Sequence, residues 1–303
     1  MDLANDPSLL SCLPIPPSAT ISVRQHGGSS FSSTWRLTAS SPSPSSPSDT
    51  PPTTTVRDFF IKTGQGDAAR VMFAGEHASL NAIADAVPGF CPRSHGHGEL
   101  ATTAKGRQYF LATDFLELGV TGGKESSSGE SLARKLARLH TTPAPAPEGM
   151  YGFPVPTCCG DTVQENGWRE SWGEFYGENR LMHVLGIGEG RNGRDAELRE
   201  AVERIVGEVV PRLLGDGHLK GVRPVVVHGD LWSGNHGRGR IAGGGVEEVV
   251  FDPAAVYGHS EYELGIMRMF GGFGREFWRE YGELVPRCEP VGEWEDRVRL
   301  YEL

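Results

Sequence analysis

The chain has 303 residues, of which 38% are hydrophobic and 22% are charged, and its formal net charge is −10. These values are typical of a globular protein long enough for one large core or two lobes. The acidic balance argues against a nucleic-acid or anionic-membrane partner, because no global positive field is present to attract either one.

The sequence gives no sign of a membrane span, a signal peptide or a disulfide framework. No apolar run is long enough to cross a bilayer, and the N-terminus lacks the basic start and apolar core of a signal peptide. The five cysteines form no Cys-x-x-Cys pair, which favours reduced thiols in a cytoplasmic protein. A zinc site can be drawn from Cys158, Cys159, His95 and His97. We reject it, because loop histidines and half-buried thiols explain these residues more simply.

Along the chain, an N-terminal segment (1–20) precedes two predicted strands, at residues 34–38 and 59–62. Between the strands, residues 40–55 form a Ser/Pro/Thr tract that cannot build a core. Because the flanking segments suit one sheet, we interpret the tract as a disordered insertion in a hairpin.

Residues 69–87 are predicted to form a helix, because apolar residues recur there at helical spacing. Glu76 lies on the same face as Phe73 and Leu80. A buried carboxylate is costly unless it is paired, and Lys62 at the end of the preceding strand is the natural partner. An exposed Lys with a half-buried Glu is the alternative for either residue taken alone.

The second half of the chain reads as mostly helical after a strand at 107–118 that runs into a connector. An aromatic stripe recurs at helical intervals and is interpreted as core rather than as a sugar platform; its members are Trp168, Trp172, Phe175 and Tyr176. Ser260 and Glu263 have the spacing of a capping box, so we assign Glu263 a structural role.

The most specific motif lies at residues 225–235 and 249–253. One apolar run leads into His228-Gly229-Asp230 with Asn235 following, and a second leads into Asp252. A kinase-type phosphotransferase needs this order: one carboxylate accepts the proton of the attacking hydroxyl, while an amide oxygen and a second carboxylate hold magnesium on ATP. Either Asp alone would be read as a turn residue, but two that both end buried strands favour catalysis. His228 is interpreted as a packed, hydrogen-bonded loop residue.

The motif predicts an α+β, two-lobed, protein-kinase-like fold. We expect a small N-terminal lobe at 21–116, with an antiparallel sheet plus one helix, and a larger, mainly helical C-terminal lobe at 117–303. In such a fold the connector Asp114, Phe115 and Leu116 is the hinge whose backbone reads adenine. The residues predicted to cradle the phosphates are Gly27, Gly28, Ser29 and Ser30.

With these residues in place, the chain resembles the fructosamine kinase family, the ketosamine-3-kinases related to aminoglycoside and choline kinases. The likeness runs from about residue 27 to the end, apart from the Ser/Pro tract, and its most specific stretch is residues 257–264, Tyr-Gly-His-Ser-Glu-Tyr-Glu-Leu. Other stretches that carry it are residues 59–62, 72–80, 157–160, 228–235, 251–254 and 270–273.

The resemblance implies ATP-dependent phosphorylation of the 3-hydroxyl of a ribulosamine or fructosamine, on a glycated protein or a small amine, which leads to deglycation. By the same resemblance, Trp232 stacks on the sugar, although a core role for this ring is an equal alternative. The other roles implied are Asp230 as proton acceptor, Asn235 and Asp252 as Mg²⁺ ligands, Lys62 as phosphate ligand and Glu76 as its anchor.

The chain departs from the family pattern in its glycine-rich loop and at its C-terminal end. Ser29 and Ser30 stand where family members often carry a Cys, so no redox-linked dimer through this loop is expected. The chain stops at Leu303, where relatives typically continue into a further helical segment, so we expect part of the C-terminal lobe and of the substrate pocket to be missing.

Two other functions remain as alternatives to a ketosamine kinase. They are a kinase of the aminoglycoside, choline or homoserine class, and a catalytically impaired ATP-binding protein.

Overall fold

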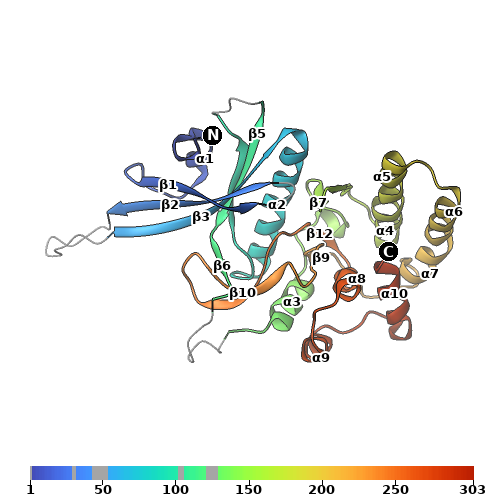
Figure 1. The fold of residues 1–303 in the computed structure, drawn as a ribbon. Helices are drawn as coiled ribbons and strands as arrows, with labels where there is room; N and C mark the ends of the chain where they lie inside the picture. Colours follow the sequence, from blue (N-terminus) through green and yellow to red (C-terminus); the bar gives the residue numbers. More distant parts are fainter. Residues whose placement is uncertain (1, 29–31, 43–53, 102–105, 121–128) are drawn as a thin grey trace.

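The computed structural model describes residues 2–28, 32–42, 54–101, 106–120 and 129–303 (Figure 1). Its first part, residues 2–115, is built on a five-stranded antiparallel sheet in the order β1-β2-β3-β5-β4, and we call it the sheet region. The strands are β1 (Thr20–Gly28), β2 (Ser33–Pro42), β3 (Thr54–Gln65), β4 (Ser94–Glu99) and β5 (Gln108–Asp114).

Helix α2 (Gly66–Ala86) confirms the predicted helix and begins three residues earlier than expected. Its apolar stripe is buried throughout, and Phe73 packs against Tyr109 and Leu111 of β5. Burial of this stripe fixes the rotation of the helix, so Glu76 on the same face is turned toward the sheet.

The N-terminal segment, for which no helix was expected, adds one in front of the sheet. Pro7–Cys12 form a second helix, α1, which begins with Pro7 and is capped by Asp6, whose carboxylate accepts a hydrogen bond from Leu9 N at 3.1 Å. Leu9 is completely buried, in the same core cluster as Leu37 and Ile61 of the sheet. Residues 1–20 therefore contribute to the core of the sheet region.

The predicted boundaries of the Ser/Pro tract were also too wide. Residues 40–42 extend β2 and residues 54–55 extend β3, with Ser40 opposite Val56 and Pro42 opposite Thr54. Regular backbone pairing continues at both ends of the tract because serine, threonine and an end-of-strand proline can all take the extended conformation. Residues 43–53 lie outside the described part of the chain.

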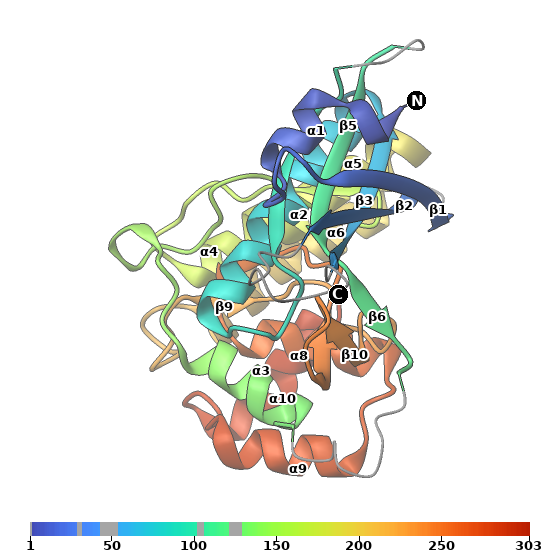
Figure 2. The same cartoon turned by 90° about the vertical axis from the view of Figure 1, so that its left-hand side faces the viewer.

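Strand β6 (Leu116–Leu118) carries the chain out of the sheet region and pairs with β10 in a three-stranded sheet, β11-β10-β6 (Figure 2). Leu116, which we had assigned to the first lobe, is opposite Ile241. The change of direction therefore falls at Phe115, one residue before the predicted boundary. The remaining strands are β7 (Thr157–Cys159), β8 (Thr162–Gln164), β9 (Val225–Val227), β10 (His236–Ile241), β11 (Val246–Val250) and β12 (Val256–Gly258).

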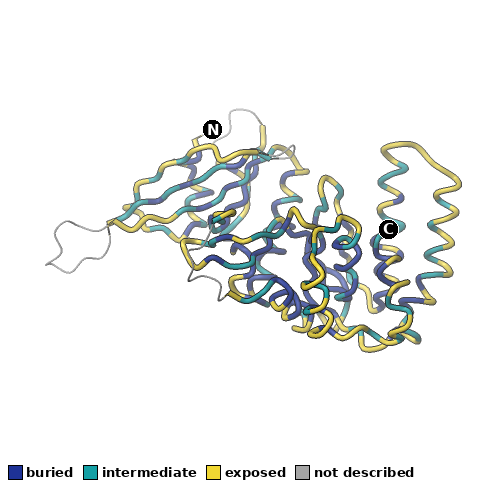
Figure 3. Tube along the Cα trace, turned by 60° about the horizontal axis from the view of Figure 1, so that its bottom comes forward, coloured by how far each residue is buried: buried dark blue, intermediate teal, exposed yellow. Residues whose placement is uncertain are grey.

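Residues 116–303 form what we call the helical region, with most of its buried residues near its centre (Figure 3). Trp172, Phe175 and Tyr176 are buried there, which confirms the core interpretation of the aromatic stripe, whereas Trp168 is partly buried. The helices are α3 (Leu132–Thr141), α4 (Trp172–Tyr176), α5 (His183–Asn192), α6 (Ala196–Arg204), α7 (Val210–Leu214), α8 (Glu261–Phe270), α9 (Arg275–Leu284) and α10 (Trp294–Tyr301).

Within the described part of the chain, every helix is too short or too polar to span a lipid bilayer.

Candidate active site

Two short buried strands deliver the residues of the central motif. β9 leads into His228, Gly229 and Asp230, and β11 leads through Phe251 into Asp252. The two loops are joined by backbone hydrogen bonds, from Phe251 N to Asn235 O at 3.0 Å and from Ala254 N to His228 O at 2.9 Å. Asp230 and Asp252 consequently line one cavity, although they are 22 positions apart in the sequence.

His228 links the two loops through its ring, which is fully buried. Nδ1 accepts a hydrogen bond from Asp230 N at 3.3 Å, and Nε2 lies 3.1 Å from Phe251 O, so the partners assign the neutral Nε2–H tautomer. Burial lowers the pKa of His228, in keeping with the neutral form. The expected packed, hydrogen-bonded role is present, and it also sets the spacing between the Asp230 and Asp252 loops.

Glu263 corrects the capping-box interpretation. Ser260 makes no side-chain hydrogen bond to the helix start, and the fully buried Glu263 carboxylate accepts from His228 N at 2.5 Å and Gly229 N at 3.0 Å. Burial alone would raise the pKa of Glu263, but the His140 ring 3.6 Å away and the backbone N–H of His228 hold it below its ordinary value. An ionised Glu263 thus anchors the backbone just before Asp230, a role that sequence reasoning missed.

The predicted ion pair of Lys62 and Glu76 is present, with Lys62 Nζ 2.7 and 2.9 Å from the two carboxylate oxygens. Lys62 also donates to Asp252 Oδ1 at 2.7 Å, a contact the sequence did not reveal. Burial would lower the pKa of Lys62, yet the two carboxylates raise it above its ordinary value. Asp252 has φ +56°, a left-handed conformation that is uncommon outside glycine and often found at functional sites.

Two cavities, of about 310 and 400 Å³, meet at this cluster and share Ser32, Lys62, Glu76 and Asp252. The sheet-side cavity is lined in addition by His26, Gly28, Phe60, Asp114, Leu116 and Phe251. The loop-side cavity is lined in addition by Cys158, Cys159, Asp230, Trp232, Asn235 and Pro253. Their junction at one cation and two carboxylates suits a group that reaches from one cavity into the other.

The predicted hinge is only partly available to a ligand. Asp114 and Leu116 line the sheet-side cavity, whereas Phe115 is buried, with its ring 5.0 Å from that of His26. The Asp114 amide already donates to Arg93 O at 2.9 Å, and the Phe115 carbonyl accepts from Ala242 N at 3.0 Å. Two backbone groups of this segment are therefore used within the protein, one beside the β4–β5 pairing and one beside the β6–β10 pairing.

The predicted glycine-rich turn lies at the end of β1. Gly28 lines the sheet-side cavity, and Gly27 has φ +120°, a conformation that favours glycine. Ser29 and Ser30 fall outside the described residues. Ser32, which lines both cavities, was not anticipated.

Asp230 lies in an environment suited to proton transfer. Burial, together with the charges of Glu263 and Asp252, raises its pKa to about 6, although hydrogen bonds from Cys159 and Asn235 lower it. Asn235 Nδ2 donates to Asp230 O at 2.8 Å and to Asp230 Oδ2 at 3.1 Å, which leaves the amide oxygen as the atom able to bind a cation. A base with a pKa near neutrality combines ionisation with proton affinity.

The same residues fit a magnesium ion by their chemistry. Lys62 pairs with the carboxylates of Glu76 and Asp252, and Asp230 lines the same loop-side cavity, so the described lining of that cavity carries three carboxylates and one ammonium group. This excess of negative charge and of oxygen donors is what Mg²⁺ prefers.

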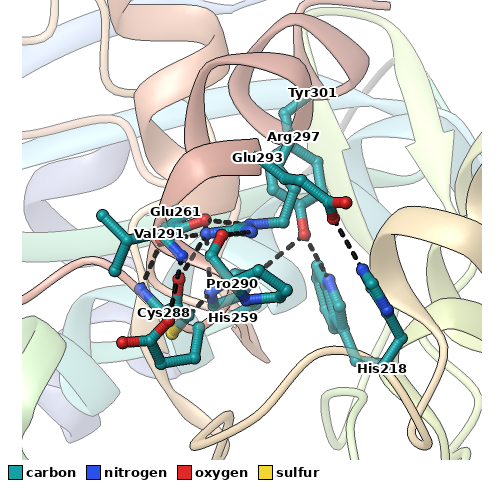
Figure 4. A network of polar contacts seen from close by, with 11 residues as sticks. His218, His259, Glu261, Cys288, Pro290, Val291, Glu293, Arg297 and Tyr301 are labelled. Atoms are coloured by element: carbon teal, nitrogen blue, oxygen red, sulfur yellow. Dashed lines mark hydrogen bonds and ion pairs between the residues drawn. The ribbon is translucent and has the colours of Figure 1, made fainter.

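A second polar cluster joins α8 to α10 and the loop before it (Figure 4). His259, Glu261 and Cys288 have ligand atoms within 4.8 Å of one another, the one such group among the described residues. Arg297 already forms an ion pair with Glu261: its Nε and Nη2 donate to the two carboxylate oxygens at 2.7 and 3.1 Å. A buried guanidinium in this position repels a metal ion, so we interpret the cluster as structural.

Comparisons with known proteins identify the family. The sequence profile of the family described as fructosamine kinase matches residues 44–303. The ketosamine-3-kinase of Mus musculus is 32% identical over 259 residues, which cover 80% of this chain and 79% of that protein. The protein-ribulosamine 3-kinase, chloroplastic, of Oryza sativa subsp. japonica is 35% identical; the match covers 82% of this chain and 66% of the rice protein, just under two thirds of its length.

Two solved structures share the fold. The putative fructosamine-3-kinase of Haemophilus somnus 129PT superposes with a TM-score of 0.68 at 22% identity, covering 94% of this chain and 82% of that one. The putative fructosamine-3-kinase of Thermobifida fusca gives a TM-score of 0.66 at 23% identity, covering 94% of this chain and 85% of that one. The chain therefore has a kinase-like mixed fold with antiparallel sheets.

Proposed function

The chain belongs to the fructosamine kinase family, and we propose that it transfers the γ-phosphoryl group of ATP to the 3-hydroxyl of a ketosamine. Membership makes it a phosphotransferase. The observation that carries the proposal is the junction of two cavities at Lys62, Glu76 and Asp252, with Asp230 on one side and the β5–β6 connection on the other.

The nucleotide belongs in the sheet-side cavity, and the sheet and helical regions act as the two lobes around it. We assign the backbone of Leu116 to the adenine edge, together with the Asp114 carbonyl, which accepts from Thr113 Oγ1 at 3.0 Å and has a second lone pair. The Asp114 amide and the Phe115 carbonyl have backbone partners within the protein. At the other end, Gly28 reaches the phosphates. We extend this role to Gly27, Ser29 and Ser30 from the sequence alone.

In the loop-side cavity, Asp230 accepts the proton of the sugar 3-hydroxyl. The oxygen of that hydroxyl attacks the γ-phosphorus of ATP, and the bond between the γ-phosphorus and ADP breaks. Lys62, held by Glu76, places a positive charge at the junction where the phosphates lie. Asn235 and Asp252 are the residues that would hold Mg²⁺, which when bound neutralises charge on the phosphates. Asn235 also holds Asp230 in position by its amide hydrogen bonds.

The mouse and rice relatives are named for ketosamine and protein-ribulosamine substrates, and we propose the same class for this chain. Phosphorylation at the 3-hydroxyl makes the sugar adduct unstable, so the sugar leaves and the amine is restored, on glycated proteins or on small amines. A cytoplasmic location remains a prediction, and the rice relative carries the word chloroplastic in its name.

The direct test incubates purified protein with Mg-ATP and a lysine carrying ribulose, and measures ADP and the sugar phosphate. Parallel reactions contain the fructose adduct, choline, homoserine and an aminoglycoside. We expect ADP release with at least one ketosamine and a phosphate on its 3-oxygen by ³¹P NMR. Faster turnover of one of the other alcohols, or nucleotide binding without any product, would contradict the proposal.

A further inference from the structure

Two aromatic side chains, Trp232 and Phe270, differ from the others in their exposure to solvent. Among the residues that the structure describes, Trp232 and Phe270 are the only exposed Phe, Trp or Tyr side chains, at 37% and 59%. They contact each other, with ring centroids 5.6 Å apart. Met269, beside Phe270, is also exposed at 53%. Since the other described Phe, Trp and Tyr rings are at least partly buried, the exposure of these two contacting rings indicates a binding surface.

The backbone around the pair is built to hold it. Helix α8 ends at Phe270, and Gly271 and Gly272 follow with φ of +66° and +92°, which glycine adopts without strain. A Cβ on Gly272 would lie 2.4 Å from Ser233 Cβ, so the turn after α8 packs directly on the loop that carries Trp232. The two rings therefore sit on a single locked surface, which is needed for a rigid binding site.

The position of this surface relative to Asp230 indicates what it binds. Trp232 lines the loop-side cavity together with Asp230, and its amide donates to Asp230 O at 3.2 Å. Phe270 does not line that cavity but contacts Trp232, so it lies one ring further from the catalytic carboxylate. The proposed nucleotide cavity opens on the other side of Lys62 and Glu76. With the sugar at Asp230, the part of a ketosamine that extends past Trp232 is the amine to which the sugar is attached, together with the peptide or small molecule that carries this amine.

We infer that Trp232 and Phe270 form a docking surface for the apolar side chains next to a glycated lysine, so that this enzyme prefers ketosamines carried on peptide segments. The inference rests on the proposed function and adds the carrier to it. Exposed Trp, Phe and Met are the side chains most enriched where proteins bind one another, and a few such residues account for most of the binding energy.

Steady-state kinetics with three substrates tests this inference. The substrates are a ribulosyl-lysine peptide flanked by leucines, the same peptide flanked by serines, and ribulosyl-Nα-acetyl-lysine. We expect Phe270→Ala to raise KM for the leucine-flanked peptide about tenfold with little change in kcat, and to leave the other two substrates within twofold. Leu284→Ala is the matched control, since Leu284 also ends a helix, α9, and is 38% exposed. It should change none of the three.

A binding measurement separates this inference from the proposed function. Fluorescence anisotropy of the labelled, unmodified leucine-flanked peptide should show weaker binding to Phe270→Ala than to the wild type and the Leu284 variant. Equal losses on all three substrates, or unchanged KM and anisotropy, would overturn the docking surface. If the wild type phosphorylates no ketosamine, the proposed function fails and the carrier assignment fails with it, even where the peptide binds. A dimer that dissociates in Phe270→Ala, seen by sedimentation velocity, would assign the surface to a second copy instead.

Discussion

In the described part of the chain, the cation–carboxylate clusters around Arg297 and Lys62 differ in how completely they are satisfied. In the helical region, Arg297 pairs with Glu261 and also donates to the backbone oxygens of Cys288 and Pro290 at 2.7 and 2.9 Å, and both charged side chains are almost inaccessible. In the junction cluster, Lys62 faces two carboxylates, and Asp252 is 52% exposed at its side chain. Arg297 and Glu261 balance each other in charge, whereas the junction cluster has two carboxylates for one ammonium group.

This difference separates a structural ion pair from a site prepared for a ligand. A buried pair contributes to folding only when every donor and acceptor is matched, as around Arg297. The junction cluster has the left-handed backbone of Asp252 and two carboxylates for one ammonium group, and it shares a cavity with Asp230, whose pKa is raised. Strain and unbalanced charge cost stability, and they are typical of the places where proteins bind and react.

The largest effect is expected from Asp230→Asn, which removes the proposed proton acceptor. Turnover should fall by about 10²- to 10⁴-fold, the range typical of general-base catalysis, as measured by ADP release. ATP binding should be retained, because Lys62 and the sheet-side cavity are unchanged. Turnover close to that of the wild type would remove Asp230 from the mechanism.

The same variant should be more stable than the wild type. The folded-state pKa of Asp230, about 6, lies above the ordinary value of 3.8, so the ionised carboxylate destabilises the folded protein above pH 6. This penalty disappears as the pH falls below about 4. Urea unfolding in EDTA should therefore show a gain of about 1–3 kcal/mol at pH 8 and no difference near pH 4. A constant difference across this range would contradict the raised pKa.

Exchanging one cation in each cluster should separate stability from activity. Arg297→Met leaves Glu261 buried without its partner and should cost about 3–5 kcal/mol of unfolding free energy, while the folded fraction keeps its affinity for ATP. Lys62→Met should cost less, because Asp252 is half exposed and Glu76 can take up a proton, but it should raise the apparent KM for ATP. An unchanged KM for ATP in Lys62→Met would contradict the assignment of the junction cluster.

A smaller effect is expected from Glu263→Gln, which replaces an acceptor of two backbone N–H groups by an amide with a single oxygen. The loop before Asp230 then loses one anchor, and we expect kcat to fall about tenfold together with a loss of about 1.5–3 kcal/mol in stability. Glu261→Gln is the matched control on the same helix, and it should lower stability without lowering kcat of the folded protein. Equal kcat in the two variants would limit Glu263 to a structural role.

The sequence was informative wherever the signal was local. The helical period of α2 placed Glu76 on a buried face, and the cost of a buried carboxylate then required Lys62 as partner. The short apolar runs before Asp230 and Asp252 identified strands whose ends meet. The Ser-x-x-Glu spacing misled us about Glu263, because a local capping pattern competed with a hydrogen bond to residues 34 and 35 positions earlier.

By itself, the amino-acid sequence determined the family, the order of the motif residues and the pairing of Lys62 with Glu76, since each depends on residue identity and on spacing within one or two neighbouring elements. Only the tertiary structure decided that Asp252 would reach Lys62 across 190 positions, that Glu263 would hold the loop before Asp230, and that Phe270 would lie against Trp232. These contacts join segments whose distance is set by how the sheet and the helices pack. That packing is a property of the whole chain, and no local period or spacing carries it.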